Sequence, residues 1–163
     1  LSLLHPHSAN WLLDANRVPK RQGNAHPNIT PYDTYATKTD PIFLAVGNDR
    51  QFATMCRHLG DESIATDARF ENNAQRNQHR AELKAILERL LAAHECRSLA
   101  DALIRAGVPC APIFEVQQAL SDPHAVHREM VVSIGESYKG VASPIKLSRT
   151  PATYRLAPPK RSG

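Results

Sequence analysis

The chain has 163 residues, of which 42% are hydrophobic, and this is enough for one globular domain with a buried core. Its formal net charge is only +4 and aromatic residues make up 6%, so the basic surface with stacking rings that nucleic-acid binding requires is not predicted. No apolar run approaches the roughly 18 residues of a membrane span, so we expect no membrane partner and, by default, a cytoplasmic protein.

The amino-terminal part predicts two different segments. Residues 2–14 predict short helical pieces, because their apolar residues suit helical turns and Pro6 interrupts them. Trp11 within this segment requires a partner surface. Residues 18–31 predict a loop, because four residues that break regular structure fall within them: Pro19, Gly23, Pro27 and Pro31.

A buried strand and a capped helix are predicted next. Residues 42–46 form a short apolar run of strand length. Asn48 followed by Gln51 is typical of a helix cap and Gly60 of a helix stop, so we expect a helix over residues 48–59. Its apolar residues have the spacing of one helical face: Phe52, Met55, Cys56 and Leu59.

Two more helices follow in the sequence. The first is predicted over residues 73–92 from one apolar stripe: Leu83, Ile86, Leu87, Leu90 and Leu91. Ser98 with Asp101 resembles a capping box, so the second is predicted over residues 98–106, ending before Gly107. Residues 108–113 are then expected to be extended, because two prolines among them prevent a helix.

The carboxy-terminal part predicts short elements. We expect a helix over residues 116–120, and another that starts at Pro123 with Asp122 as its cap. Residues 130–134 and 141–147 predict a hairpin, with the turn at residues 135–140. The tail after Pro151 is expected to be extended.

Together these elements predict an α+β fold, in which a small antiparallel sheet of three to four strands is packed by three main helices. The strands at 42–46 and 130–134 are expected to share that sheet. The expected organisation has three parts: an arm with the glycine-containing loop (1–28), the α+β domain (29–150) and an extended linker (151–163).

Several short motifs follow one another in a fixed order along the chain. They are Arg21-Gln-Gly-Asn-Ala-His-Pro-Asn-Ile-Thr-Pro-Tyr32, Ile42 to Phe52, Asp67-Ala-Arg-Phe70, Asn73 with Arg76, Gly107-Val-Pro-Cys-Ala-Pro112, Asp122-Pro-His124, Met130-Val-Val132, Pro144-Ile-Lys-Leu-Ser148 and Thr150-Pro151. In this order they resemble the family III CoA-transferases, the group of formyl-CoA transferase, carnitine CoA-transferase and α-methylacyl-CoA racemase. The resemblance spans nearly the whole chain.

The resemblance implies that the chain corresponds to the family's small domain with both linkers. The family's amino-terminal Rossmann-like half, which binds CoA and supplies a catalytic aspartate, has no match in these residues. We therefore expect a carboxy-terminal small-domain fragment of an acyl-CoA:carboxylate CoA-transferase. By itself it should be inactive, have no catalytic residue and bind no cofactor; a coenzyme A thioester is the substrate of the full-length family.

The candidate site is the loop that contains Gly23, Asn24, His26 and Pro27. Glycine permits close backbone approach, and a histidine here can donate or accept a hydrogen bond. The resemblance implies that this loop closes over the catalytic aspartate and the acyl group. The alternative is a linker turn that only shapes the chain.

Other polar residues suggest structural roles. Arg76 is expected to brace loop carbonyls, because its guanidinium presents five donors in a fixed fork. Asp49 suits the first turn of its helix without any further function. His124 and His127 are three residues apart, but no third ligand is evident and no metal site is expected. The three cysteines, widely separated, indicate no disulfide framework and are expected to be reduced and largely buried.

Two functional alternatives stay open. In one, a separate CoA-binding polypeptide supplies the missing half and completes an enzyme. In the other, the chain is a stand-alone dimerising or binding module without turnover. A homodimer is expected in either case, because the apolar arm residues require a partner: Leu4, Trp11, Leu12 and Leu13.

Overall fold

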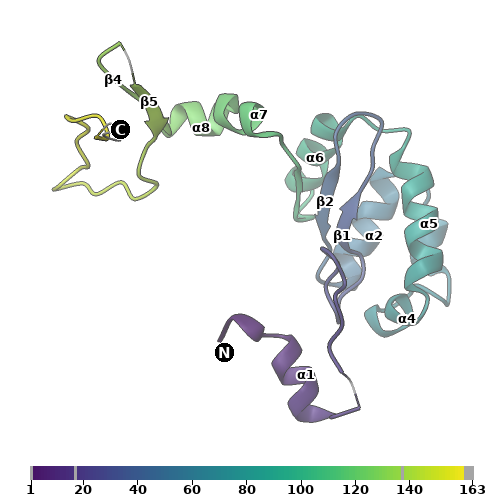
Figure 1. Ribbon diagram of the computed structural model, residues 1–163. Coiled ribbons are helices and arrows are strands. Elements are labelled where there is room, and N and C mark those ends of the chain that lie inside the picture. Colours follow the sequence, from purple (N-terminus) through teal and green to yellow (C-terminus); the bar gives the residue numbers. More distant parts are fainter. Residues whose placement is uncertain (1, 17, 137, 160–163) are drawn as a thin grey trace. The chain divides into compact units, whose positions relative to one another are not determined.

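The computed structural model describes residues 2–16, 18–136 and 138–159. The chain divides into two compact units, Leu1–Ile113 and Phe114–Gly163, and each is treated by itself (Figure 1). No helix in the described ranges is long and apolar enough to cross a membrane. The α+β class with small antiparallel sheets is confirmed, whereas the three-part organisation expected from the sequence stays a prediction.

The first unit is built on a three-stranded antiparallel sheet of order β1-β2-β3. The strands are β1 (Tyr32–Tyr35), β2 (Ile42–Ala45) and β3 (Cys110–Pro112). Tyr35 lies opposite Ile42, and Leu44 lies opposite Cys110. The central strand β2 buries Ile42 and Leu44 completely, which confirms the strand predicted from its apolar run. Strand β1 was not predicted, because its sequence Tyr32-Asp-Thr-Tyr35 has no apolar run and no strict alternation.

Helix α2 (Asp49–His58) follows the central strand and begins as predicted. The side chain of Asn48 accepts a hydrogen bond from the Gln51 N–H at 2.9 Å, which satisfies one of the free donors of the first turn. The helix buries Phe52, Met55 and Cys56. Gly60 ends this segment with a φ of +84°, a conformation that favours glycine. The short helix α3 (Ser63–Thr66) that comes next was not predicted.

The long helix predicted over residues 73–92 was wrong in one respect, because the structure has two helices there. These are α4 (Asn73–Gln78) and α5 (Arg80–Leu91), and they meet at His79, whose φ of −101° and ψ of 27° are not helical. The physical reason lies in their different partners. Helix α4 is tied by polar side chains to the loop before β1, whereas α5 places its leucines in the core.

Helix α6 (Cys96–Arg105) starts earlier than predicted. The predicted cap at Ser98 was wrong, because the Glu95 carboxylate caps this helix. It accepts from the N–H groups of Arg97 at 3.1 Å and Ser98 at 2.8 Å. The hydroxyl of Ser98 instead donates to the Glu95 carbonyl. The predicted end is confirmed, since Gly107 has a φ of +81°.

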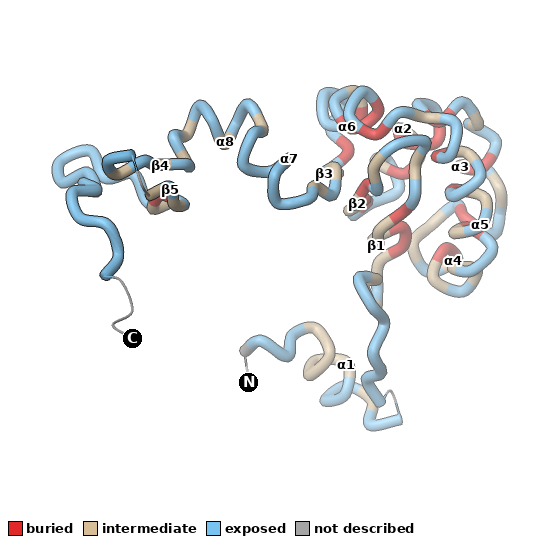
Figure 2. Tube along the Cα trace, turned by 45° about the horizontal axis from the view of Figure 1, so that its top comes forward, coloured by how far each residue is buried: buried red, intermediate tan, exposed pale blue. Residues whose placement is uncertain are grey.

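The hydrophobic core of the first unit lies between the sheet and these helices (Figure 2). Its fully buried members include Phe70, Leu83, Leu87, Leu91 and Leu103. Outside this core are η1 (Ser2–Leu4) and α1 (His7–Leu13), which form the amino-terminal arm. Helix α1 has no buried residue, so the arm contributes nothing to the core.

The second unit contains four short elements: α7 (Val116–Ser121), α8 (Pro123–His127), β4 (Val131–Ile134) and β5 (Tyr138–Val141). Both helices were predicted. The Asp122 side chain caps α8 by accepting from the His124 N–H at 2.9 Å, and Pro123 occupies its first turn. The described tail, residues 151–159, contains no helix or strand.

The hairpin of the second unit corrects two expectations. Its second strand begins at Tyr138, opposite Ile134, and not at Val141. The earlier start is possible because Gly135 turns the chain directly after β4 with a φ of +59°. Strands β4 and β5 also form a separate sheet of two strands. The prediction that residues 130–134 share the sheet of β2 was therefore wrong, because β4 pairs with β5 alone, while β2 pairs with β1 and β3.

Candidate functional site

The loop that precedes β1 contains the four predicted site residues. Residues 18–31 form neither helix nor strand, as predicted. Gly23 turns the chain with a φ of +64°, and no atom lies near the position that a side chain would occupy. The Ala25 N–H donates to the Gln22 carbonyl at 3.3 Å and closes the turn. Glycine is thus required for conformation at this point.

Among the four predicted site residues, His26 is held by both its backbone and its ring. Its N–H donates to the Tyr32 carbonyl at 2.9 Å, and its ring lies 5.1 Å from the Tyr32 ring. Its Nδ1 accepts from the Asn28 N–H at 3.1 Å. Burial lowers the pKa of His26, and the positive charge of Arg80 lowers it further. Both effects favour the neutral imidazole.

The other predicted residues lie around His26 in less constrained positions. Asn24 makes a long contact of 3.5 Å from its side-chain nitrogen to the Thr34 hydroxyl on β1. Pro27 is half-buried and lines a pocket, while Gly23 is exposed. The structure therefore gathers all four on one loop. It places no catalytic carboxylate of the described residues in hydrogen-bond contact with them.

Two asparagines of α4 hold the end of the loop. The side-chain nitrogens of Asn73 and Asn77 both donate to the Asn28 carbonyl, at 2.8 Å and 2.7 Å. Their side-chain oxygens accept from Thr30, the first from its N–H at 3.1 Å and the second from its hydroxyl at 2.7 Å. Each amide is thus used at both ends, which fixes residues 28–30 against the helix.

Arg76 lies between these asparagines and is fully buried. Its guanidinium donates to the Thr30 carbonyl at 2.8 Å and the Phe70 carbonyl at 2.9 Å. It also pairs with Asp49 at 2.6 Å and lies 4.5 Å from the centre of the Phe52 ring. The expected bracing role of Arg76 is confirmed. Asp49 does more than open its helix, because it neutralises this buried charge.

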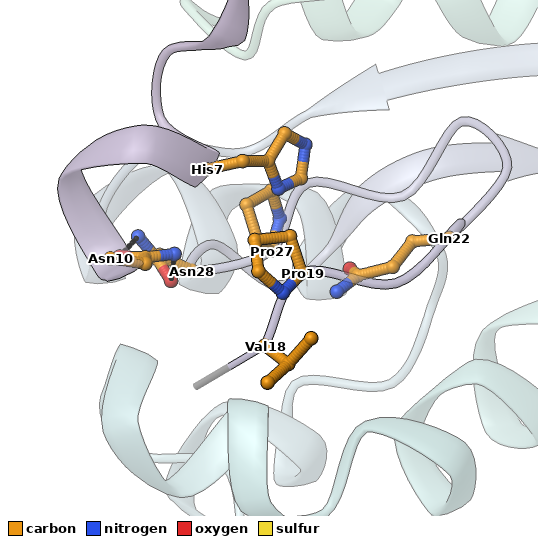
Figure 3. Close-up of a pocket in the computed structure, with 7 residues that line it drawn as sticks. All are labelled: His7, Asn10, Val18, Pro19, Gln22, Pro27 and Asn28. Carbon is orange, nitrogen blue, oxygen red and sulfur yellow. Dashed lines mark hydrogen bonds between the residues drawn. The ribbon is translucent and has the colours of Figure 1, made fainter. Parts of the chain in front are cut away.

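A small pocket adjoins the loop on the side of the amino-terminal arm (Figure 3). Its volume is about 210 Å³, and it is lined by His7, Asn10, Val18, Pro19, Gln22, Pro27 and Asn28. The side chains of Asn10 and Asn28 exchange two hydrogen bonds, of 3.1 Å and 3.0 Å, which tie α1 to the loop. Polar and apolar groups are mixed in its wall.

The remaining sequence candidates do not form a reactive centre in the described residues. His124 and His127 both lie on α8, but no group of three or more His, Cys, Asp or Glu side chains is placed to hold a metal. Cys56 and Cys96 are buried. Burial raises the pKa of Cys56 to about 12 and that of Cys110 to about 11, so neither thiol is an activated nucleophile.

Sequence reasoning missed Asn77 as a loop contact, and it gave Arg80 no separate role. The Arg80 guanidinium donates to the Asn77 side-chain oxygen at 2.6 Å and lies 3.5 Å from the Pro27 carbonyl. A signal was present. Asn73, Arg76, Asn77 and Arg80 have the spacing i, i+3, i+4 and i+7, so a polar stripe follows one helical face where an apolar stripe would be usual.

Comparison with known proteins extends this picture. The sequence profile of CoA-transferase family III matches residues 1–162. The succinate–glutarate CoA-transferase of Agrobacterium fabrum is 36% identical over 163 residues, which cover 98% of this chain and 40% of that protein. The acetyl-CoA:oxalate CoA-transferase of Acetobacter aceti is 33% identical over 135 residues, covering 81% of this chain and 34% of that protein.

Solved structures show the same relationship. A CAIB/BAIF family protein from Brucella suis superposes with a TM-score of 0.83 at 34% identity, over 98% of this chain and 42% of that one. A protein from M. tuberculosis, with a TM-score of 0.74 at 18% identity, shares the fold. The chain therefore spans well under half the length of these relatives. From the profile match over residues 1–162 and these likenesses, the chain belongs to CoA-transferase family III.

Proposed function

We propose that this chain forms the small-domain part of an enzyme that transfers coenzyme A from an acyl-CoA to a carboxylic acid. The chain alone is inactive in this proposal, because the reaction needs a carboxylate nucleophile held next to a bound thioester. A CoA-binding part, on the same or a separate polypeptide, supplies both. Support comes from the family profile and from the share of each relative that the chain covers.

The chain's own contribution is the loop of Gly23, Asn24, His26 and Pro27, which closes over the reacting groups. The observation that carries this role is the way the loop is anchored. Five hydrogen bonds from Asn73, Arg76 and Asn77 fix residues 28–30 directly beside it. An anchored loop can exclude water from the acyl-enzyme intermediates, which would otherwise hydrolyse.

The proposed substrates are short dicarboxylic acids and their CoA thioesters. The relatives point to this class by name, since they act on succinate and glutarate in one case and on oxalate in another. The human relative, 29% identical over 127 residues that cover 78% of this chain and 29% of that protein, is a succinyl-CoA:glutarate CoA-transferase.

A chimera tests this proposal. Residues 1–163 replace the matching segment of the Agrobacterium fabrum succinate–glutarate CoA-transferase, and the formation of glutaryl-CoA from succinyl-CoA and glutarate is measured. We expect the chimera to be active and the isolated chain to show no turnover. Gly23→Val in the same chimera tests the role of the loop. It should lower the rate relative to the unmodified chimera, because valine is strained at a φ of +64°. A folded chimera without activity, or turnover by the isolated chain, would contradict the proposal.

A second proposal concerns assembly and rests on the amino-terminal arm. Leu4, Trp11 and Leu12 are 53%, 45% and 82% exposed and line an apolar hollow of about 560 Å³ with His7, Ser8 and Pro19. Exposed apolar surface of this kind favours association, so we propose a homodimer through the arm. Light scattering should give twice the chain mass of 18.0 kDa. Deletion of residues 1–16 should give the monomer, and a monomeric full chain would contradict this proposal.

A further inference from the structure

We propose that Asn73, Asn77 and Arg80, together called the polar clamp, act through the backbone of residues 27–28 to hold His26 as its neutral Nε2–H tautomer. His26 then serves the closing loop as a fixed hydrogen-bond donor, and not as an acid or base. The group that accepts this hydrogen bond is inferred from the proposed function, and that part of the inference rests on it. The tautomer itself is a property of this chain alone and is tested on it directly.

A hydrogen bond between Asn28 and His26 determines which ring nitrogen carries the proton. A backbone N–H can only donate, so the His26 Nδ1 at 3.1 Å must offer its lone pair. A neutral imidazole carries one proton, which must then be on Nε2. Among the described residues, no hydrogen bond to this second nitrogen is found. Its proton is therefore available to a group outside them.

The polar clamp fixes the Asn28 backbone on both sides of this N–H. The Asn28 N–H and the Pro27 carbonyl belong to one peptide unit, and Arg80 lies 3.5 Å from that carbonyl. The next peptide unit presents the Asn28 carbonyl, which receives the side-chain nitrogens of Asn73 and Asn77. These contacts hold both peptide units, so the Asn28 N–H stays directed toward the imidazole.

The charge around the His26 ring also favours the neutral form. Burial is the main cause of the lowered pKa of His26, and the charged groups that lower it further are Arg80 from α5, then His7 from α1 and His5 before it. None of these groups can stabilise an imidazolium. Protonation of Nδ1 would also turn the Asn28 N–H toward another N–H and break their hydrogen bond. Geometry and charge therefore favour the same neutral form, and the lowered pKa of His26 agrees with it.

A neutral, fixed donor suits the chemistry of the proposed reaction. When a carboxylate or a thiolate attacks an acyl carbonyl, negative charge develops on the carbonyl oxygen, and donors that are already in position stabilise it. The reaction then needs no proton from His26. The three residues of the clamp act as positioning residues, because they contact the loop and not the substrate.

The first test measures the tautomer in the purified chain by nitrogen-15 NMR of its histidine rings. His26 should show the Nε2–H pattern at pH 7. His58 provides an internal control, because its Nδ1 lies 2.9 Å from the Thr54 carbonyl and must carry the proton there. The opposite pattern at His26 would overturn the proposal.

The second test weakens the clamp. In the double variant Asn73→Ala, Asn77→Ala, His26 should become a mixture of tautomers and its pKa should rise, because the loosened loop leaves the ring less buried. His124 and His127 should be unchanged. If the double variant does not fold, Arg80→Met should raise the His26 pKa by itself. A folded variant in which His26 keeps its tautomer and its pKa would contradict the role of the clamp.

The third test measures the donor in the active chimera. A glutamine amide can place an N–H near the position of Nε2, so His26→Gln should keep the rate within roughly 10-fold, whereas His26→Ala should lose roughly 100-fold. The rate of His26→Gln should show the same pH dependence as the parent. A rate for His26→Gln as low as that of His26→Ala would show acid or base chemistry instead. An inactive chimera would remove the proposed function but leave the NMR result standing.

Discussion

Helices α5 and α1 both carry leucines, yet they differ in what covers them. Leu83, Leu87 and Leu91 of α5 are completely buried, whereas Leu12 and Leu13 of α1 are 82% and 86% exposed (Figure 2). The difference lies in neighbouring elements and not in residue type. Helix α5 packs against β1 and the core around it, while α1 is tied to its own unit mainly through the Asn10 and Asn28 amides. Apolar content alone therefore does not show which helix stabilises the fold.

The loop with the candidate site lies between these two regions, and it depends on the buried one. Residues 28–30 are held by α4, whose Arg76 is fully buried although it carries a charge. A buried cation is costly unless its donors are satisfied, and Arg76 satisfies its donors with two carbonyls and one carboxylate. The buried and charged Arg76 thus anchors the loop to the core.

The largest effect is expected from Arg76→Ala, which should lower the free energy of unfolding by about 3–5 kcal/mol. The substitution leaves the Thr30 and Phe70 carbonyls without their donor and opens a cavity beside Phe52. Urea denaturation of the purified chain measures the loss. Arg89→Ala provides the control, because Arg89 is exposed on α5 and its loss should cost under about 0.5 kcal/mol. Equal losses in the two variants would show that Arg76 is not a structural anchor.

The comparison of α5 with α1 is tested by matched leucine substitutions. Leu87→Ala should cost about 2–5 kcal/mol because it leaves a cavity in the core, whereas Leu12→Ala should cost under about 0.5 kcal/mol. Urea denaturation measures both. If the loss at Leu12 grows with protein concentration, the arm contributes to association. A large loss at Leu12 that does not depend on concentration would mean that the arm belongs to the core.

A smaller effect is expected from Asp49→Asn, about 1 kcal/mol. The Asp49 side chain is 59% exposed, so water weakens its ion pair with Arg76, and an asparagine oxygen still accepts the hydrogen bond. Asp101→Asn serves as the control, because Asp101 is exposed on α6. A loss at Asp49 as large as that of Arg76→Ala would show that charge neutralisation, rather than the two carbonyl contacts, dominates the anchor.

The elements that sequence reasoning predicted well are those with local signals. Asn48 and Gly60 delimit α2, and Asp122 with Pro123 starts α8, because caps act through the nearest backbone groups. The hairpin of β4 and β5 was predicted from its turn, whereas its separation from the sheet of β2 depends on contacts between distant residues, which no local signal indicates. The cap of α6 was misplaced because Glu95 caps the helix three residues earlier, through the N–H groups of Arg97 and Ser98.

The candidate loop was found from its glycine and prolines, but its anchor was found only in part. Arg76 was predicted to brace carbonyls, and it does so. Asn77 was missed because asparagine is common on exposed helix faces, although its place in a polar stripe was a signal. In the structure its side-chain nitrogen lies 2.7 Å from the Asn28 carbonyl oxygen. The break at His79 was also missed. It separates α4, which is held by polar contacts, from α5, which is held by apolar packing.

The most direct test of the account is amide hydrogen exchange in the purified chain, because its central claim is that the core anchors the site loop. The N–H groups of His26 and Thr30 are bonded to the Tyr32 carbonyl and the Asn73 side chain. They should be protected nearly as strongly as the Leu83 N–H of α5, while the Asn10 and Asp14 N–H groups of α1 should exchange much faster. Exchange at Thr30 as fast as at Asn10 would contradict the account.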